Sequence, residues 1–243
     1  VLNKGSEHNI NFLSFQLQPD ASLPETAKLL KAAGVSAELQ SDPQPGMAEA
    51  LKIADPDGYA LYLYQAGAFN EQGFGTQGIV PQKLGHVALL VQDIQKTVTF
   101  YTDVLGFRWS DWIADFFVFM RCGPDHHSMN FLERPSKGVH HVAYQLRDAA
   151  HMQAASDWLA QHKIPLIWGP GRHGPGHNLF TYHADPDGTV IELFAELDLM
   201  LDEALGYFEP KPYHEEFPQR PKHWDLTPQA PNKYQIMPPE GFL

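Results

Sequence analysis

Three residues with metal-binding side chains stand at matching places in a repeated pattern of this sequence. His86 lies near the start of the apolar run LGHVALLV, His141 lies near the start of GVHHVAYQL, and Glu192 follows ADPDG within TVIELF. Two imidazoles and one carboxylate are a ligand set that binds divalent iron or manganese on one face and leaves the opposite positions open. The residue types therefore predict a metal centre formed by His86, His141 and Glu192.

The doublet His140-His141 offers two candidates for one of these ligand positions. Neighbouring residues of a strand point to opposite faces of the sheet, so we expect only one of the two to reach the site. His86 directly precedes Val-Ala, and His141 does the same. This match favours His141 over His140.

The elements that must position these residues recur along the chain, and self-similarity of this kind indicates a repeated unit. Short runs with alternating apolar residues, namely NINFLSFQL, LGHVALLV and HHVAYQL, are each followed by a helix-like stretch and further short strands. The first and third copies both close on ADPDG, which predicts a tight turn before a final strand. We expect three βαβββ modules, at about 7–66, 83–134 and 138–196. The fold class is therefore α+β, with paired modules forming a curled mixed sheet around the metal site.

The repeat contains an internal comparison between its first and third copies. Phe12 stands where the third copy has His141, and Tyr62 stands where it has Glu192. Equivalent fold positions thus carry metal-type residues in one copy and aromatic residues in the other. We interpret the first copy as scaffold and the last two as the working half.

This pattern predicts four regions along the chain. Residues 1–66 form a metal-free module that we expect to belong to a longer native domain, and 67–82 form a Gly/Gln-rich linker. Residues 83–197 form a catalytic domain of two modules. The Pro-rich extension 198–243 is irregular, and we expect it to close over the site as a lid through aromatic side chains: Tyr207, Phe208, Tyr213 and Trp224.

Composition narrows the class of protein. Of 243 residues, 43% are hydrophobic and 19% are charged, which is typical of an ordinary globular protein. The net charge of −12 argues against nucleic acid and against an anionic membrane surface as partners. Cys122 is the single cysteine, so a reduced cytoplasmic setting is expected. Thirteen histidines favour nitrogen and oxygen ligands for the metal.

The three ligand candidates, together with GPGRHGPGHNLFTYHADPDGTVIE at 169–192, resemble the glyoxalase/bleomycin resistance (vicinal oxygen chelate) superfamily. Within it, the chain is most similar to type I extradiol dioxygenases over about 7–200. The resemblance implies Fe(II), or alternatively Mn(II), as cofactor. It also implies a catechol and O₂ as substrates, ring cleavage with insertion of both oxygen atoms, and a homo-oligomer. The chain has one module fewer than the four of that family.

The resemblance also implies roles for residues near the ligands. His127 would be the acid/base, Tyr182 would donate a hydrogen bond to a substrate oxygen, and His173 would orient the substrate. Without the resemblance, histidines at these places are typical of exposed turns, and Tyr182 is typical of a strand. The residues expected to line the substrate pocket are aromatic: Trp168, Phe180 and Trp112. By the same resemblance, a tryptophan at 168 implies a catechol with an uncharged substituent.

Two other functions stay open at this point. A glyoxalase-like isomerase or lyase would share the fold and the metal, and Glu133 as a fourth ligand would favour it. A metal-free small-molecule binding protein is the other alternative. The sequence leaves undecided the catechol, iron against manganese, the ring bond that is cleaved and the oligomeric state.

Overall fold

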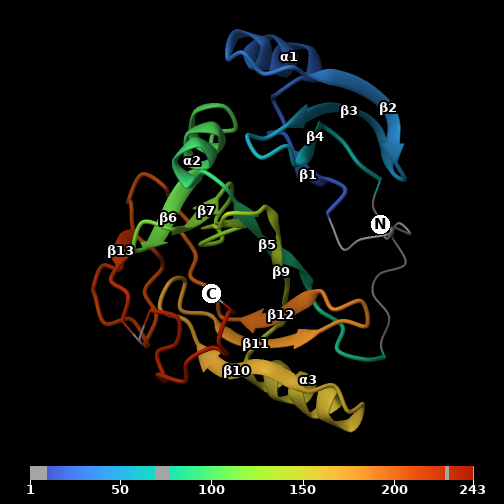
Figure 1. Cartoon of the computed structure of the whole chain (residues 1–243). Helices are drawn as coiled ribbons and strands as arrows, with labels where there is room; N and C mark the ends of the chain where they lie inside the picture. Colours follow the sequence, from blue (N-terminus) through green and yellow to red (C-terminus); the bar gives the residue numbers. More distant parts are fainter. Residues whose placement is uncertain (1–9, 69–76, 228–229, 243) are drawn as a thin grey trace. The chain divides into compact units, whose positions relative to one another are not determined.

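The computed structural model describes residues 10–68, 77–227 and 230–242 of the chain (Figure 1). The chain forms two compact units, which we call unit 1 (1–74 with 95–105) and unit 2 (75–94 with 106–243). Half of the expected linker, 69–76, lies outside the described residues. The boundaries expected from the sequence at 66, 82 and 197 stay predictions.

Unit 1 contains one complete module and a second helix. Its described strands form a four-stranded sheet in the order β1-β4-β3-β2. Helix α1 begins after Ser22, whose hydroxyl accepts the backbone N–H of Glu25, and it ends before Gly34, which adopts a φ of 77°. The elements of this unit are β1 (Leu13–Gln16), α1 (Leu23–Ala32), β2 (Glu38–Gln44), β3 (Met47–Ala54), β4 (Ala60–Tyr64) and, except for its first residue, α2 (Ile94–Asp103).

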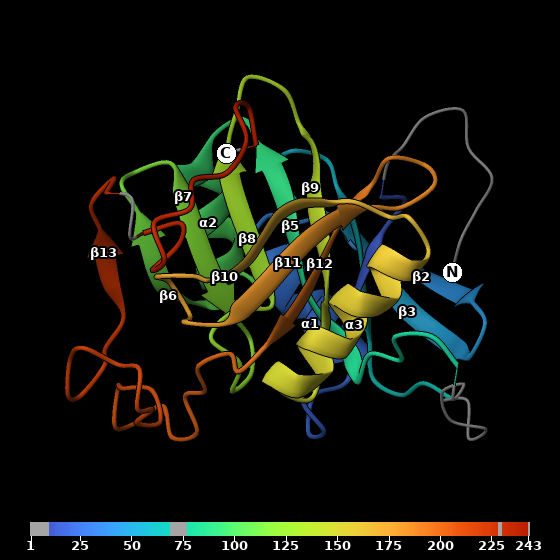
Figure 2. The same ribbon diagram turned by 90° about the horizontal axis from the view of Figure 1, so that it is seen from below.

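Unit 2 is built on one large mixed sheet. Within the described residues this sheet has nine strands in the order β10-β11-β12-β9-β5-β8-β7-β6-β13. The sheet curves from β13 around to β10 (Figures 1 and 2). Its elements are β5 (Lys83–Val91), β6 (Arg108–Ile113), β7 (Phe117–Arg121), β8 (Met129–Glu133), β9 (Gly138–Gln145), α3 (Ala149–Gln161), β10 (Leu166–Arg172), β11 (Leu179–Ala184), β12 (Val190–Ala195) and β13 (Lys222–Trp224).

The strand order repeats three times along the chain. In each copy the first strand pairs in parallel with the last one, as in β1–β4, β5–β8 and β9–β12. The two copies in unit 2 meet through the antiparallel pair β5–β9, which makes one continuous sheet of both. The α+β fold of repeated βαβββ modules with a curled mixed sheet is therefore confirmed.

Helix α3 covers the outer face of the third module. Asp148 caps its first turn by accepting the N–H of His151 at 2.8 Å. Its apolar side packs on β11 and β12 through a buried cluster: Leu146, Met152, Ala155, Leu159, Leu193 and Ala195. The opposite face of these strands is thereby left for the site.

The extension after β12 lies across unit 2 with little regular structure, as its prolines predict. One short strand in it, β13, was not predicted. It pairs in parallel with β6. Asp111 secures this pair by accepting the N–H of Lys222 and the indole N–H of Trp224. None of the helices in the described parts of the chain has the length and apolar character needed to cross a lipid bilayer.

Candidate metal centre

His86 and His141 occupy equivalent positions on the two central strands of unit 2. The β5–β9 ladder shifts its register at Gly85, just before His86, and again at His140, just before His141. A β-bulge leaves an extra residue and turns the next side chain. Gly85 is required at its bulge because a Cβ there would overlap the ring of Phe194, which packs beside His86. The repeated bulge aims both imidazoles at one point.

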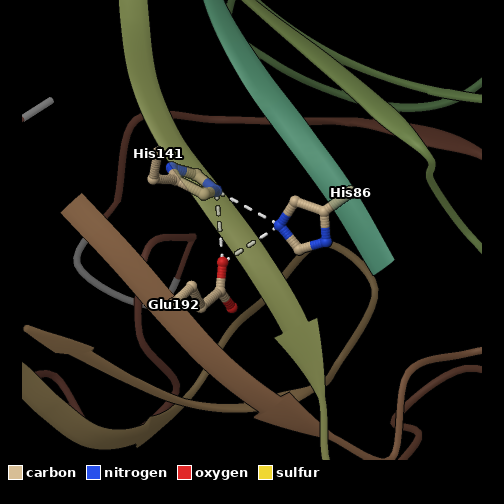
Figure 3. Close-up of side chains that lie close together, drawn as sticks. All are labelled: His86, His141 and Glu192. Carbon is tan, nitrogen blue, oxygen red and sulfur yellow. Dashed lines mark hydrogen bonds and ion pairs between the residues drawn. The ribbon is translucent and has the colours of Figure 1, made fainter. Parts of the chain in front are cut away.

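The three predicted ligands converge, and all are buried (Figure 3). Nε2 of His86 lies 3.1 Å from Nε2 of His141 and 3.0 Å from Oε2 of Glu192. Nε2 of His141 lies 3.2 Å from the same oxygen. Three ligands at about 2.1 Å from an ion and at right angles to one another would be separated by about 3.0 Å. The side chains present therefore fit a divalent cation bound on one face.

Glu192 is held in the ionised form that a metal ligand needs. Burial alone would raise its pKa, but His86, His141 and their hydrogen bonds outweigh burial and hold the pKa well below its usual range. Nδ2 of Asn178 donates to Oε1 at 3.0 Å, and the phenol of Tyr182 donates to Oε2 at 3.0 Å. These two bonds, one to each carboxylate oxygen, fix the orientation of the carboxylate plane.

His140 supports the neighbouring histidine and is not part of the ligand cluster. Its Nδ1 lies 2.7 Å from Nδ1 of His141, and its Nε2 lies 2.5 Å from the carbonyl oxygen of Phe242. If His140 donates to Phe242, its Nδ1 accepts from His141, and the lone pair on Nε2 of His141 stays free for an ion. Because His140 is the bulged residue, both members of the doublet border the site. The choice of His141 as ligand thus agrees with the geometry.

His127 lies beside the ligand candidates and is buried. A histidine in an exposed turn was the expectation without the family resemblance. Its ring centroid is 4.3 Å from that of His86, and Nδ1 of His126 lies 2.9 Å from its own Nδ1. Burial, with the nearby His86 and His126, lowers the pKa of His127 well below 6.5. The imidazole is therefore neutral at neutral pH and has a lone pair on one ring nitrogen.

Tyr182 and His173 form a second hydrogen-bonded pair that ends on Glu192. Nε2 of His173 lies 3.0 Å from the phenol oxygen of Tyr182, and its Nδ1 lies 2.5 Å from the carbonyl oxygen of Pro231. Burial lowers the pKa of His173 to about 4, so Nδ1 donates to Pro231 and Nε2 is an acceptor. Burial and the charge of Glu192 raise the pKa of Tyr182, which keeps its proton. One phenol proton thus faces two acceptors.

A pocket opens onto these residues. Its wall contains all three ligand candidates and the three predicted catalytic residues, together with apolar side chains and Asn130. Within the described residues its lining contains no lysine or arginine. The residues around it are His86, Ile113, Phe117, Phe119, His127, Asn130, His140, His141, Trp168, His173, Pro175, Tyr182, Glu192, Ala230, Pro231 and Phe242.

The predicted pocket aromatics divide into one that lines the cavity and two that do not. Trp168 lines it. Trp112 is not among the lining residues: its neighbour Ile113 faces the cavity, so Trp112 points to the other side of β6 and stacks on His223. Phe180 is not a lining residue either, and it lies behind His173 with the ring centroids 3.8 Å apart.

The extension contributes to the pocket through different residues from those expected. Ala230, Pro231 and Phe242 line it, whereas the four predicted aromatics are not among the lining residues. Phe208, for example, packs on His126, and Tyr213 donates to the carbonyl oxygen of Glu196. A Pro-rich tail carries no periodicity from which the path of single side chains can be predicted.

Sequence reasoning missed a buried hub at Asp198. Its carboxylate accepts from Nδ1 of His177 at 2.7 Å and from Nε2 of His214 at 2.8 Å. Its backbone carbonyl accepts the N–H of His126, and its own N–H donates to Gly176. The hub joins the loop after His173, the turn before His127 and the extension. No local pattern signals it, because its partners come from distant segments.

Glu133 is not part of the centre. Its carboxylate accepts the backbone N–H of Ile94 at 2.9 Å, at the start of helix α2.

In the first module, Phe12 and Tyr62 meet edge to face with ring centroids 5.0 Å apart, at the places equivalent to His141 and Glu192. An aromatic pair therefore stands where the third module has two of its ligand candidates.

Comparison with known proteins agrees with this geometry. Residues 83–193 match the model of the Glyoxalase/Bleomycin resistance protein/Dioxygenase superfamily. The superfamily expected from the motifs is thus confirmed.

Individual relatives are named for ring cleavage. Metapyrocatechase 2 of Cupriavidus necator is 34% identical over 125 residues, which are 51% of this chain and 39% of that protein. The chain thus spans about two fifths of the length of this relative. An iron-dependent extradiol dioxygenase of Rhodococcus jostii is 28% identical over 84% of this chain and 76% of that protein.

Among solved structures, one similar protein has a different name. The Mn(II)-bound glyoxalase from Novosphingobium aromaticivorans has a TM-score of 0.79 at 27% identity and covers 99% of this chain and 76% of that one. The fold is therefore common to proteins named for two different reactions.

Proposed function

We propose that this protein is an extradiol dioxygenase that cleaves the aromatic ring of a catechol with O₂ and inserts both oxygen atoms. The observation that carries the proposal is the convergence of His86, His141 and Glu192 at one wall of a pocket that also contains His127, Tyr182 and His173. Relatives named metapyrocatechase and extradiol dioxygenase support it.

The proposed cofactor is Fe(II), with Mn(II) as the alternative. Both ions accept two imidazoles and a carboxylate. One relative is named iron-dependent, and another, a 2,3-dihydroxybiphenyl 1,2-dioxygenase from Geobacillus, is named manganese-dependent. When bound, such an ion would hold the diol and O₂ side by side and provide a path for electrons between them.

His127 is the proposed acid/base. Its imidazole is neutral and buried in the pocket wall, so it accepts a proton from the diol as the diol enters and returns it later in the reaction. Its bond to His126 holds the ring in place. A base in this position removes the diol proton without admitting bulk water.

Tyr182 and His173 are proposed to orient the diol. The phenol keeps its proton and lies within 3.0 Å of both Glu192 and His173, so a small rotation directs that proton to a substrate oxygen in the pocket. Phe180 stacks on His173 and fixes its ring. The pair thereby sets the side of the pocket on which the diol oxygens lie.

The pocket lining supports an uncharged catechol. Trp168, Phe117 and Phe119 present apolar surface, and the lining formed by described residues offers no cationic side chain to pair with a carboxylate. Ala230, Pro231 and Phe242 of the extension are proposed to act as a lid that keeps water out. The protein is also proposed to form a homo-oligomer and to work in the cytoplasm.

The test is anaerobic reconstitution with Fe(II), followed by a panel of catechols and air. A yellow ring-opened product and uptake of one O₂ per catechol are expected, with uncharged catechols turned over faster than carboxylated ones. Fully metal-loaded protein that consumes no O₂ with any catechol would contradict the proposal.

A glyoxalase-like reaction is the second candidate, because the manganese-bound structural relative carries that name. The same metal-loaded protein would catalyse this reaction without consuming O₂. The reconstitution assay therefore separates the two candidates, since an oxygen electrode responds to only one of them.

A further inference from the structure

The two modules of unit 2 contribute matched residues to the centre, and the register identifies a fourth member of the set. Ala143, two residues after His141, pairs with Glu192 across β9 and β12. Ala88, two residues after His86, pairs with Asn130 across β5 and β8 in the same parallel arrangement. Asn130 therefore holds, in the second module, the place that Glu192 holds in the third.

Asn130 faces the pocket and is incompletely satisfied. Its side chain lines the cavity and is 1% exposed, and its Oδ1 is buried without a hydrogen-bond partner among the described residues. A buried amide oxygen without a hydrogen-bond donor is disfavoured, so its presence points to a ligand that donates a hydrogen bond. Oδ1 of Asn178 is also buried without a partner among the described residues, but the amide nitrogen of Asn178 bonds Glu192 and its side chain does not line the cavity.

The charge of the centre explains why an amide suits this place. Two imidazole ligands bring no charge and one carboxylate ligand brings one negative charge, so a divalent ion bound by this set keeps one positive charge. A singly deprotonated diol neutralises that charge and still has one hydroxyl to donate. A carboxylate at 130 would neutralise the ion first and would compete with the diol for it.

We propose that Asn130 contacts the substrate and that its carboxamide oxygen accepts a hydrogen bond from the diol. Because the amide is neutral, it does not compete with the diol for the ion, as a carboxylate at this position would. This inference rests on the proposed metal-dependent function. It assigns to the second module a part in substrate selection, next to the ligand that the same module supplies.

Two substitutions separate charge from hydrogen bonding. Asn130→Asp changes the amide to a carboxylate of the same shape, and Asn130→Ala removes the group. Thr181→Val is the control, because Thr181 is buried on β11, contacts Met152 and is not a lining residue. Mn(II) affinity is measured from the free-ion electron paramagnetic resonance signal, and catechol affinity by anaerobic calorimetry on Mn(II)-loaded protein.

The proposal expects opposite shifts for the two ligands. Asn130→Asp should bind Mn(II) at least tenfold more tightly and catechol at least tenfold more weakly. Asn130→Ala should keep Mn(II) affinity within about twofold and bind catechol about three- to tenfold more weakly, as for one lost hydrogen bond. Thr181→Val should change neither value.

Three results would overturn the inference, and they are distinguishable. Unchanged catechol affinity in both variants would make Asn130 an ordinary wall residue. A large loss of Mn(II) affinity in Asn130→Ala would make it a metal ligand. Wild-type protein that binds no divalent ion would overturn the proposed function together with the inference, whereas the first two results leave the proposed function intact.

Discussion

The phenol oxygen of Tyr182 lies 3.0 Å from Oε2 of Glu192, the oxygen that also faces both histidine ligands. Because Tyr182 and Glu192 are directly paired across β11 and β12, the backbone ladder sets this contact. A hydrogen-bond donor therefore stands at the edge of the candidate metal centre without being a ligand itself.

Tyr182→Phe should keep stoichiometric metal and lower kcat/KM for catechol by about tenfold, since it removes one orienting hydrogen bond and no ligand. Metal analysis and steady-state kinetics check this. Tyr144→Phe is the matched control, because Tyr144 packs on the cluster under helix α3. Loss of metal in Tyr182→Phe would show that the phenol is needed for binding the ion.

His141→Ala should lose bound metal and activity together, because it removes one of the three proposed ligands. His183→Gln should keep both, since His183 lies on β11 and is not a lining residue of the pocket. Elemental analysis after anaerobic loading and gel filtration is the measurement. One metal per chain in His141→Ala would remove this histidine from the ligand set.

His127→Phe should keep the metal and slow kcat by about 10²-fold or more, in line with the loss of an acid/base group. The ring of Phe is planar and only somewhat larger than imidazole, so folding is expected to survive. Turnover at the wild-type rate would exclude His127 as the proton acceptor, and loss of metal would assign it to the ion.

Asp198→Asn should destabilise unit 2 by about 2–4 kcal/mol, because the carboxylate accepts bonds from two buried histidines. Burial alone would raise the pKa of Asp198, but the bonds from His177 and His214 outweigh it and lower the pKa. The stability from this group is thus present above pH 3.8 and lost as pH falls through the folded pKa.

Urea titration measures this loss, and faster proteolysis within 199–227 should accompany it. Asp202→Asn is the control, because Asp202 is exposed. Equal stability of Asp198→Asn and wild type between pH 6 and 8 would show that the hub contributes nothing to the fold.

Asp55→Asn should remove a pH dependence from unit 1. Burial raises the pKa of Asp55 from 3.8 to about 6. The folded state therefore binds this proton more tightly than the unfolded state, and stability falls by about 3 kcal/mol as pH rises from about 4 to above 6.

The asparagine can still accept the N–H groups of Asp57 and Tyr59, so the turn is expected to persist. Urea titrations at pH 4.5 and 7.5 compare the variant with wild type. Asp185→Asn changes the half-buried counterpart in the third module and should leave the slope unaltered. An unchanged slope in Asp55→Asn would assign the pH dependence to another group.

Much of the site could be predicted because its signals are local or repeated. The alternation around His86 and His141 places each on a strand, and the ADPDG turn places Glu192 on the strand that follows. The shared Val-Ala after each histidine aligned two copies, and the register of β5 and β9 agrees with that alignment. A repeat thus gives spatial equivalence that one isolated motif lacks.

The pocket lining differed from the expected one where the direction of a side chain depended on more than the repeat. Trp112 and Ile113 are neighbours on β6, and only the strand's register decides which of them faces the pocket. Phe242 reaches His140 through a tail whose path follows no periodic pattern.

The amino-acid sequence by itself determined the repeated modules, the ligand types and the spacing that assigns one histidine to each central strand, because hydrophobic period and turn residues act over a few positions. Tertiary structure alone decided that Asn130 holds in the second module the register position that Glu192 holds in the third, that Asp198 accepts hydrogen bonds from His177 and His214, and that Phe242 of the tail lines the pocket. Those relations depend on strand register, bulges and the path of distant segments, which only the folded chain brings together.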